Sequence, residues 1–191
     1  MRNNFFKLLL TAVVIIVGIF LTLQYFSSGK QSVEGKLMSQ ACEDIQSYET
    51  FRAEQEVDSL IEVIIRHRFP AGSGSNWTEA EILMDLRGIK DEIAFHNMDI
   101  EMYHKAFSKV LNKLAYAHMQ DAKAFLEKNS KAAAKASMNE ACHFIHDAMF
   151  FSRGKIASDQ KQLLRKMRSM TESDVNMKEI EECMQLTIAM I

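Results

Sequence analysis

The sequence predicts an all-α protein in which one N-terminal transmembrane helix precedes an antiparallel bundle of about four helices, one of them long and coiled-coil-like. Three observations support this fold class. One proline and seven glycines in 191 residues leave few positions at which a helix has to end. An uncharged apolar segment of membrane-spanning length lies near the N-terminus. Behind it, apolar residues recur at helical spacing.

These observations predict two parts. Residues 1–29 are expected to hold a cytoplasmic stub, the transmembrane anchor and the start of a linker, and residues 30–191 an extracytoplasmic helical domain. The part behind the anchor has a formal charge of about −4, the wrong sign for a surface that binds phosphates. Nucleic acid is therefore excluded as an expected partner.

The membrane contact is predicted at residues 5–26. No charged residue lies between Leu8 and Leu23, whereas Arg2 and Lys7 precede the apolar core. This charge placement predicts a single-pass protein of the inner (cytoplasmic) membrane, with a cytoplasmic N-terminus and a C-terminal domain in the periplasm or another extracytoplasmic compartment. A cleavable signal peptide is the alternative, but the apolar core is longer than the usual 7 to 15 residues or so.

The first helix of the bundle is expected from Val33 to about Arg68. Its apolar residues form two stripes that are out of phase around Gln55, so we expect a kink or a change of packing partner there. The first stripe contains Leu37, Ala41, Tyr48 and Phe51, and the second contains Val57, Leu60, Ile61, Ile64 and Ile65.

The second helix is expected to follow a loop at residues 69–78. Thr78 and Glu81 form a capping-box pattern, and Trp77 is placed to pack on Ile82. One apolar stripe then continues to about residue 125, so an unbroken helix would be roughly 70 Å long. Gly88 and Asn112 are the positions considered for a break. The stripe consists of Ile82, Leu86, Ile89, Ile93, Ile100, Tyr103, Phe107, Leu111, Leu114, Ala122 and Phe125.

The rest of the chain is expected to form two more helices. Lys128-Asn-Ser130 reads as a tight turn, because asparagine tolerates the left-handed conformation and serine caps helices. A third helix is predicted from there to about Met170. The polar segment 171–174 then separates it from a last helix with Met177, Ile180, Met184, Ile188 and Ile191 on its apolar face.

Three core-facing histidines are the candidate site residues. His96, His104 and His118 lie near the middle of the long apolar stripe. One interpretation is structural, with each imidazole neutral and hydrogen-bonded in the core. The other is that they bind copper or zinc, with Met98 and Met102 as soft ligands, or respond to pH.

Two Glu-x-x-His motifs suggest a bundle-core metal enzyme as a further alternative. They start at Glu101 and Glu140, and their spacing matches that of di-iron bundles. The helical phase, however, puts Glu140, His143 and Asp147 on the side that should face water. No nucleophile elbow, phosphate-binding loop or H-E-x-x-H motif is present in the sequence.

The cysteines are expected to be buried side chains. Cys42, Cys142 and Cys183 are far apart in sequence and contain no C-x-x-C pair, so neither a zinc knuckle nor a thioredoxin-like motif is present.

The sequence thus favours a non-enzymatic function. We expect a membrane-anchored helical interaction or scaffold protein that contacts protein partners, or copies of itself, through its apolar helical seams. The alternatives are a membrane-tethered sensor that binds a metal or small ligand through core histidines, and a bundle-core metal enzyme.

Overall fold

The computed structural model of the chain describes residues 31–66, 76–96 and 99–191, except for the side chains of residues 76–78. The chain divides into two compact units, Met1–Gln31 and Ser32–Ile191. The predicted membrane segment at residues 5–26 lies outside the described residues. Within the described ranges, no helix is long and apolar enough to cross a membrane.

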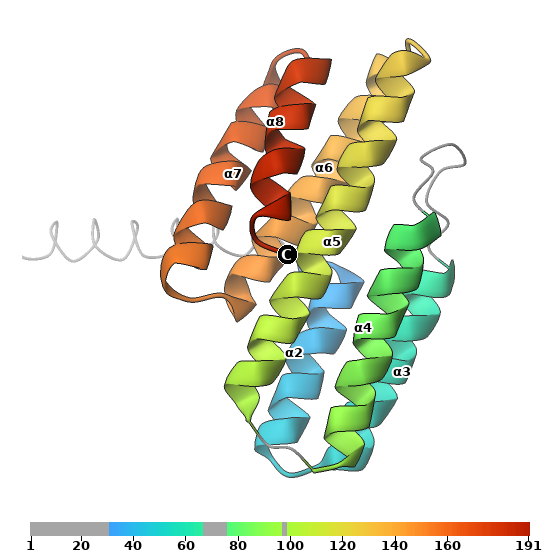
Figure 1. Cartoon of the computed structure of the whole chain (residues 1–191), viewed down its shortest axis with the longest axis vertical. Helices are drawn as coiled ribbons and strands as arrows, with labels where there is room; N and C mark the ends of the chain where they lie inside the picture. Colours follow the sequence, from blue (N-terminus) through green and yellow to red (C-terminus); the bar gives the residue numbers. More distant parts are fainter. Residues whose placement is uncertain (1–30, 67–75, 97–98) are drawn as a thin grey trace, which may run out of the picture. The chain divides into compact units, whose positions relative to one another are not determined.

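The described residues form seven α-helices and no strand (Figure 1). All-α architecture is therefore confirmed, but the number of helices exceeds the predicted four. The helices are α2 (Val33–Gln46), α3 (Thr50–Arg66), α4 (Asn76–Ala94), α5 (Ile100–Glu127), α6 (Lys131–Ala148), α7 (Gly154–Glu172) and α8 (Met177–Ile188), and a 3-10 turn, η1 (Met149–Phe151), joins α6 to α7.

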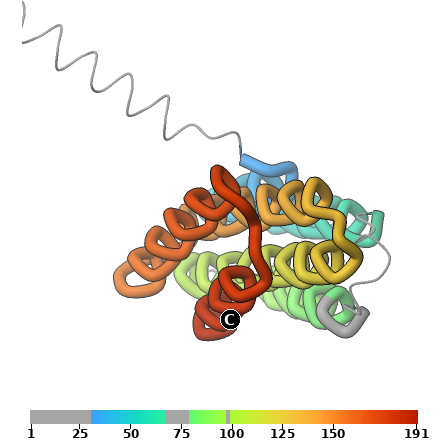
Figure 2. Tube along the Cα trace, turned by 90° about the horizontal axis from the view of Figure 1, so that it is seen from above, coloured from blue at the N-terminus to red at the C-terminus, as the bar shows by residue number. Residues whose placement is uncertain are grey.

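Helix α5 is the central element of Ser32–Ile191. It has 28 residues, a length of about 42 Å, and it packs on α2 and α4 as well as on α6 and α8. Seen along the bundle, α4, α5 and α8 lie in one layer and α2, α3 and α6 in the other (Figure 2). By their packing, the helices form two groups of four antiparallel helices that share α5. One group is α2, α3, α4 and α5, and the other is α5, α6, α7 and α8.

Two pairs of connections lie at opposite ends of the bundle. The α2–α3 and α4–α5 connections lie together at one end, and the α5–α6 and α7–α8 turns lie at the other (Figure 1). An ion pair of 3.6 Å between Lys131 Nζ and Asp174 Oδ2 joins the two turns at the second end.

The first predicted helix is two helices. The chain reverses after Ser47, where Tyr48 has a φ of 60°, and α3 packs back against α2. This reversal explains the change in apolar phase, which the sequence placed near Gln55. Tyr48 and Phe51, assigned to the core stripe, are exposed instead because the chain turns at their positions.

The predicted 70 Å helix is also divided. It breaks after Ala94, where His96 has a φ of 59°. Helix α5 then starts at Ile100 and is capped by Asp99, whose carboxylate accepts a hydrogen bond from the Glu101 N–H. Gly88 and Asn112 both lie inside helices. The stripe itself is confirmed as a core face, since nine of its eleven residues are buried and Ile100 and Phe125 are partly buried.

The third predicted helix ends early as well. It stops at Ala148, and the chain turns through η1 before α7 begins at Gly154, which has a φ of 59°. The predicted turn at Lys128-Asn-Ser130 is confirmed, with Asn129 at a φ of 57°. Ser130, however, makes no side-chain capping hydrogen bond.

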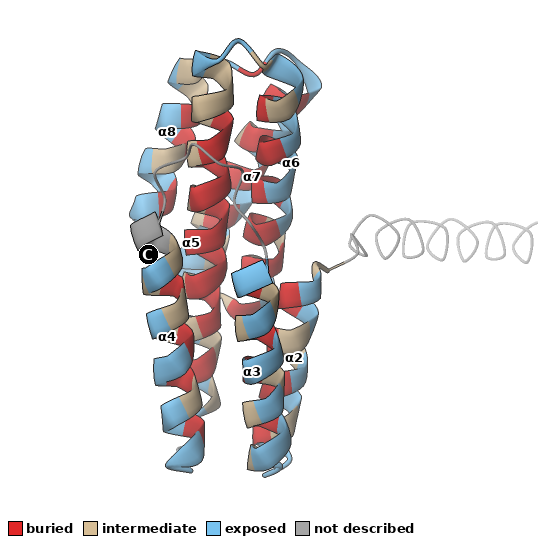
Figure 3. Cartoon of the chain, turned by 90° about the vertical axis from the view of Figure 1, so that its right-hand side faces the viewer, coloured by how far each residue is buried: buried red, intermediate tan, exposed pale blue. Residues whose placement is uncertain are grey.

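The apolar seams pack against each other within one chain. Buried residues face the interior of the bundle along every helix, and exposed residues cover its outside (Figure 3). The largest fully buried side chains include Tyr103, Phe107, Phe144, Leu111 and Leu114. The faces that the sequence assigned to partner binding therefore form the core of this unit.

The start of α2 packs on the end of α6. Asp147 in the last turn of α6 is 1% exposed, and its Oδ2 accepts a hydrogen bond of 2.8 Å from the Ser32 N–H. The Ser32 hydroxyl in turn accepts from the Gly35 N–H at 2.9 Å. The prediction that Asp147 faces water is wrong, because α2 begins where the outer face of α6 would otherwise be solvated.

Candidate functional site

Three exposed aromatic side chains mark one end of the bundle. Tyr48 follows α2, Phe51 lies in the first turn of α3 and Phe95 follows α4, so all three belong to connections at the same end. Their exposed fractions are 77%, 71% and 83%. Only one other aromatic residue in the described ranges, Phe150, is comparably exposed. We call the surface of Tyr48, Phe51 and Phe95 the aromatic end.

Acidic residues surround the aromatic end. The bases in and next to its two connections are Arg52, which pairs with Glu49 at 2.5 Å, and Lys90, which pairs with Asp58 at 2.6 Å. The remaining charge is therefore negative. The acids at this end are Glu43, Asp44, Glu49, Asp91, Glu92 and Asp99.

Both connections use an unusual residue to end a helix. Tyr48 donates its N–H to Ile45 O at 3.1 Å, and His96 donates to Ile93 O at 2.9 Å. This is the left-handed helix stop that glycine or asparagine usually provides. The left-handed conformation costs roughly 1 kcal/mol at residues other than glycine. The chain therefore accepts backbone strain at the two places that display the aromatic side chains.

The predicted histidine site is dispersed in the structure. His96 is exposed in the α4–α5 connection, so its predicted core placement is wrong. His104 is half-buried, with its ring centroid 6.0 Å from that of Phe151. His118 is buried and stacks on Phe144 at 5.4 Å. No group of three or more His, Cys, Asp or Glu side chains in the described part of the chain is placed to hold a metal ion.

Within the described residues, the two Glu-x-x-His motifs do not come together as a metal site. Glu101 forms an ion pair of 2.6 Å with Arg153. Glu140 and His143 are exposed on α6, as their helical phase predicted.

A cavity of about 300 Å³ lies where α5, the η1–α7 junction and the last described residues meet. Its lining combines three basic residues, two serines, His104 and an apolar surface. The lining residues are Glu101, His104, Lys105, Ser108, Lys109, Phe151, Ser152, Arg153, Ile156, Met190 and Ile191.

A buried polar network adjoins this cavity. Gln160, fully buried in α7, donates from Nε2 to Ser108 Oγ at 3.2 Å and to Asn112 Oδ1 at 3.1 Å. Asn112 donates to Met190 O at 3.2 Å, and Ser108 Oγ lies 2.6 Å from Ser152 Oγ. The network ties α5 to α7 and to the end of α8.

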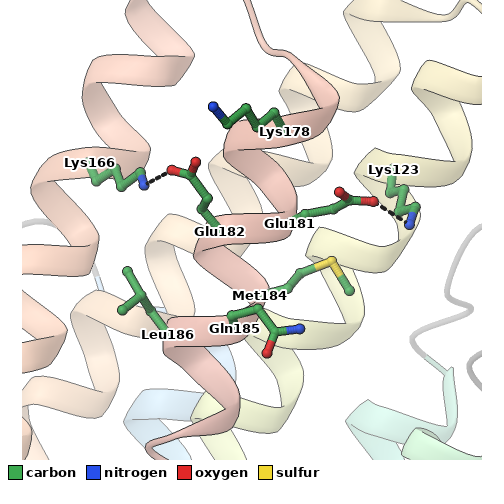
Figure 4. Close-up of a pocket in the computed structure, with 8 residues that line it drawn as sticks. All are labelled: Lys123, Lys166, Lys178, Glu181, Glu182, Met184, Gln185 and Leu186. Carbon is green, nitrogen blue, oxygen red and sulfur yellow. Dashed lines mark hydrogen bonds and ion pairs between the residues drawn. The ribbon is translucent and has the colours of Figure 1, made fainter.

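A second hollow, of about 720 Å³, runs along the outer face of α8 (Figure 4). Lys123 binds Glu181 at 2.7 Å on one side, and Lys166 pairs with Glu182 on the other. The hydrogen bond from Lys166 lowers the pKa of Glu182. The charges in each of these two pairs neutralise each other, and Lys178 is the remaining charged residue of the lining.

The cysteines are buried, as expected. All three are free thiols. Burial raises the pKa of Cys42 and of Cys142 to about 12, and that of Cys183 to about 11. A thiol with such a pKa is not a nucleophile near neutral pH.

No family model, curated protein or solved structure matches this chain in comparisons with known proteins.

Proposed function

We propose that this chain is a membrane-anchored interaction module whose aromatic end binds a basic, apolar segment of a partner protein. The observation that carries the proposal is the exposure of Tyr48, Phe51 and Phe95 within an acidic surface at one end of the bundle. Exposed apolar groups gathered in this way are typical of protein-binding surfaces.

Aromatic side chains are efficient anchors for a partner. They bury a large apolar area, and few rotatable bonds are fixed when they do so. Acidic residues around such anchors attract a basic partner and disfavour an acidic one. The acids at Glu43, Asp91 and Glu92 therefore select for lysine or arginine next to the apolar residues of the partner.

Self-association through this surface is disfavoured. Two copies would bring the same excess of acidic residues together, and the predicted seams are already buried inside the chain. This supports a different protein as the occupant.

The anchor at residues 5–26 belongs to the same proposal. Its role is to hold the module at the cytoplasmic membrane, with Ser32–Ile191 on the extracytoplasmic side. A reporter that is active only outside the cytoplasm, fused after residue 191, should be active. An expressed but inactive fusion would contradict this topology.

Selection from a random peptide library displayed on phage tests the aromatic end. The full-length chain is the bait, and the triple variant Y48A/F51A/F95A removes background binders. We expect enriched peptides to contain lysine or arginine beside aromatic or leucine residues. Their binding should fall as salt rises from about 50 mM to about 500 mM, because exposed charges are then screened.

The variant Phe150→Ala is the matched control, since it removes an exposed aromatic residue from another part of the bundle. It should bind the selected peptides as the wild type does. The proposal is wrong if the enriched peptides are acidic or if none is enriched beyond background. It is also wrong if Phe150→Ala weakens binding of the selected peptides as much as the triple variant does.

A further inference from the structure

The cavity at the η1–α7 junction has an excess of basic groups. Arg153 is neutralised by Glu101 at 2.6 Å. Lys109 lies 3.8 Å from an Asp85 oxygen that Lys113 binds at 2.7 Å, and Lys105 has no ion-pair partner among the described residues. The lining contains one carboxylate and three basic side chains, so it favours a negatively charged ligand.

Both serine hydroxyls in the lining already donate their protons to other groups of the protein. Ser152 Oγ donates to Ala148 O at 2.9 Å, so Ser108 must donate in the 2.6 Å contact between the two hydroxyls. Ser108 also accepts from Gln160 Nε2. A hydroxyl has one proton and two lone pairs, so each serine keeps one lone pair and no proton for a ligand. A ligand group that hydrogen-bonds to either serine therefore has to be the donor.

The rest of the lining suits an apolar body. Phe151, Ile156 and Met190 contribute apolar side chains. The volume of about 300 Å³ is at the lower limit for small-molecule sites. A single ring or a short aliphatic chain matches this size.

We propose that this cavity binds a small organic anion whose apolar body also carries a hydrogen-bond donor, such as a hydroxyaryl carboxylate. The anion contacts Lys105 and Lys109, and the donor contacts the free lone pairs of Ser108 and Ser152. This site shares no residue with the aromatic end, so it does not depend on the function proposed above.

Calorimetric titration of the full-length chain with 4-hydroxyphenylacetate tests both requirements. Two close analogues act as matched probes: 4-hydroxyphenylacetamide lacks the charge, and 4-methylphenylacetate lacks the donor. We expect the parent compound to bind with a Kd of about 1 mM or below, and each analogue to bind at least about 5-fold more weakly.

Two variants and one control locate the binding. Lys105→Met should weaken the parent compound and leave the uncharged analogue unaffected. Ser152→Val should weaken the parent and spare the analogue without the donor. Lys135→Met, an exposed lysine at the far end of α6, should change neither. The proposal is overturned if the parent compound does not bind or if all three compounds bind equally. It is also overturned if both cavity variants bind the parent as the wild type does.

Discussion

Replacing Gly35 by alanine should destabilise the bundle, because the new methyl group meets a buried carboxylate. A Cβ at this position would lie 2.6 Å from Asp147 Oδ2 and 2.9 Å from Cγ, both inside van der Waals contact. Asp147 is 1% exposed and binds the Ser32 N–H, so its carboxylate cannot turn away without leaving that N–H unpaired.

The expected magnitude follows from two opposing terms. Alanine is favoured over glycine inside a helix by about 1 kcal/mol. Against this, overpacking costs about 1 to 3 kcal/mol, and loss of the charge-assisted hydrogen bond from Ser32 costs about 1.5 to 3 kcal/mol. The net loss should be about 2 kcal/mol or more, which lowers the Tm of a unit of this size by roughly 4 to 8 °C.

Gly88→Ala is the matched control. Gly88 is exposed within α4, and no atom lies within 4 Å of the position that a Cβ would take. This substitution should raise stability by up to about 1 kcal/mol. Urea unfolding of the full-length chain, followed by circular dichroism, measures both variants.

The same substitution in an Asp147→Ala protein separates the steric clash with this carboxylate from other effects of alanine at position 35. In Asp147→Ala the carboxylate is absent, so Gly35→Ala should cost less there than in the wild type. If Gly35→Ala proves as stable as Gly88→Ala, or costs the same in both backgrounds, then α2 does not pack on α6 as described.

Two further predictions concern the buried polar groups. Asn112→Ala should cost about 2 kcal/mol or more, because it leaves Met190 O without its donor and removes one of the two acceptors of Gln160 Nε2. The exposed Asn139→Ala should change urea stability little, and equal effects would refute the network. The three thiols should resist a disulfide reagent at pH 8 until the chain unfolds, and rapid labelling of the native protein would contradict their burial. Burial raises the pKa of Cys42 from 9.0 to about 12, so above pH 9 the thiol ionises in the unfolded chain but stays neutral in the folded one. The free energy of unfolding should therefore be unaffected by this thiol below pH 9 and should fall above pH 9 by up to about 1.4 kcal/mol per pH unit. Urea unfolding at pH 8 and pH 10 should show a decrease that shrinks in Cys42→Ala.

The sequence could predict helices and their core faces because apolar spacing depends on the helix alone. It could also locate the turn at Asn129, since asparagine commonly adopts the left-handed conformation there. Tyr48 and His96 end helices with the same geometry, but tyrosine rarely adopts it, and histidine is not one of the usual helix-ending residues, glycine and asparagine. The two breaks were therefore missed or misplaced, and α2–α3 and α4–α5 were each read as one helix.

The candidate site was harder to predict because it depends on how separate helices meet. Tyr48 and Phe51 fit an apolar stripe, and only the reversal of the chain between them exposes both at the end of the bundle to which Phe95 also belongs. Asp147 faces away from the core of its own helix and is buried by a segment more than a hundred residues earlier. The spacing of apolar residues along one helix does not reveal contacts with segments this far away in the sequence.

The aromatic end is the surface proposed to bind a partner. The affinity of one selected basic peptide for the wild-type chain, Phe95→Ala and Phe150→Ala tests this role. A buried aromatic anchor is worth about 2 kcal/mol, so Phe95→Ala should weaken binding by roughly 30-fold and Phe150→Ala by less than about 2-fold. If Phe95→Ala binds the peptide as tightly as the wild type does, partner binding lies elsewhere on the molecule.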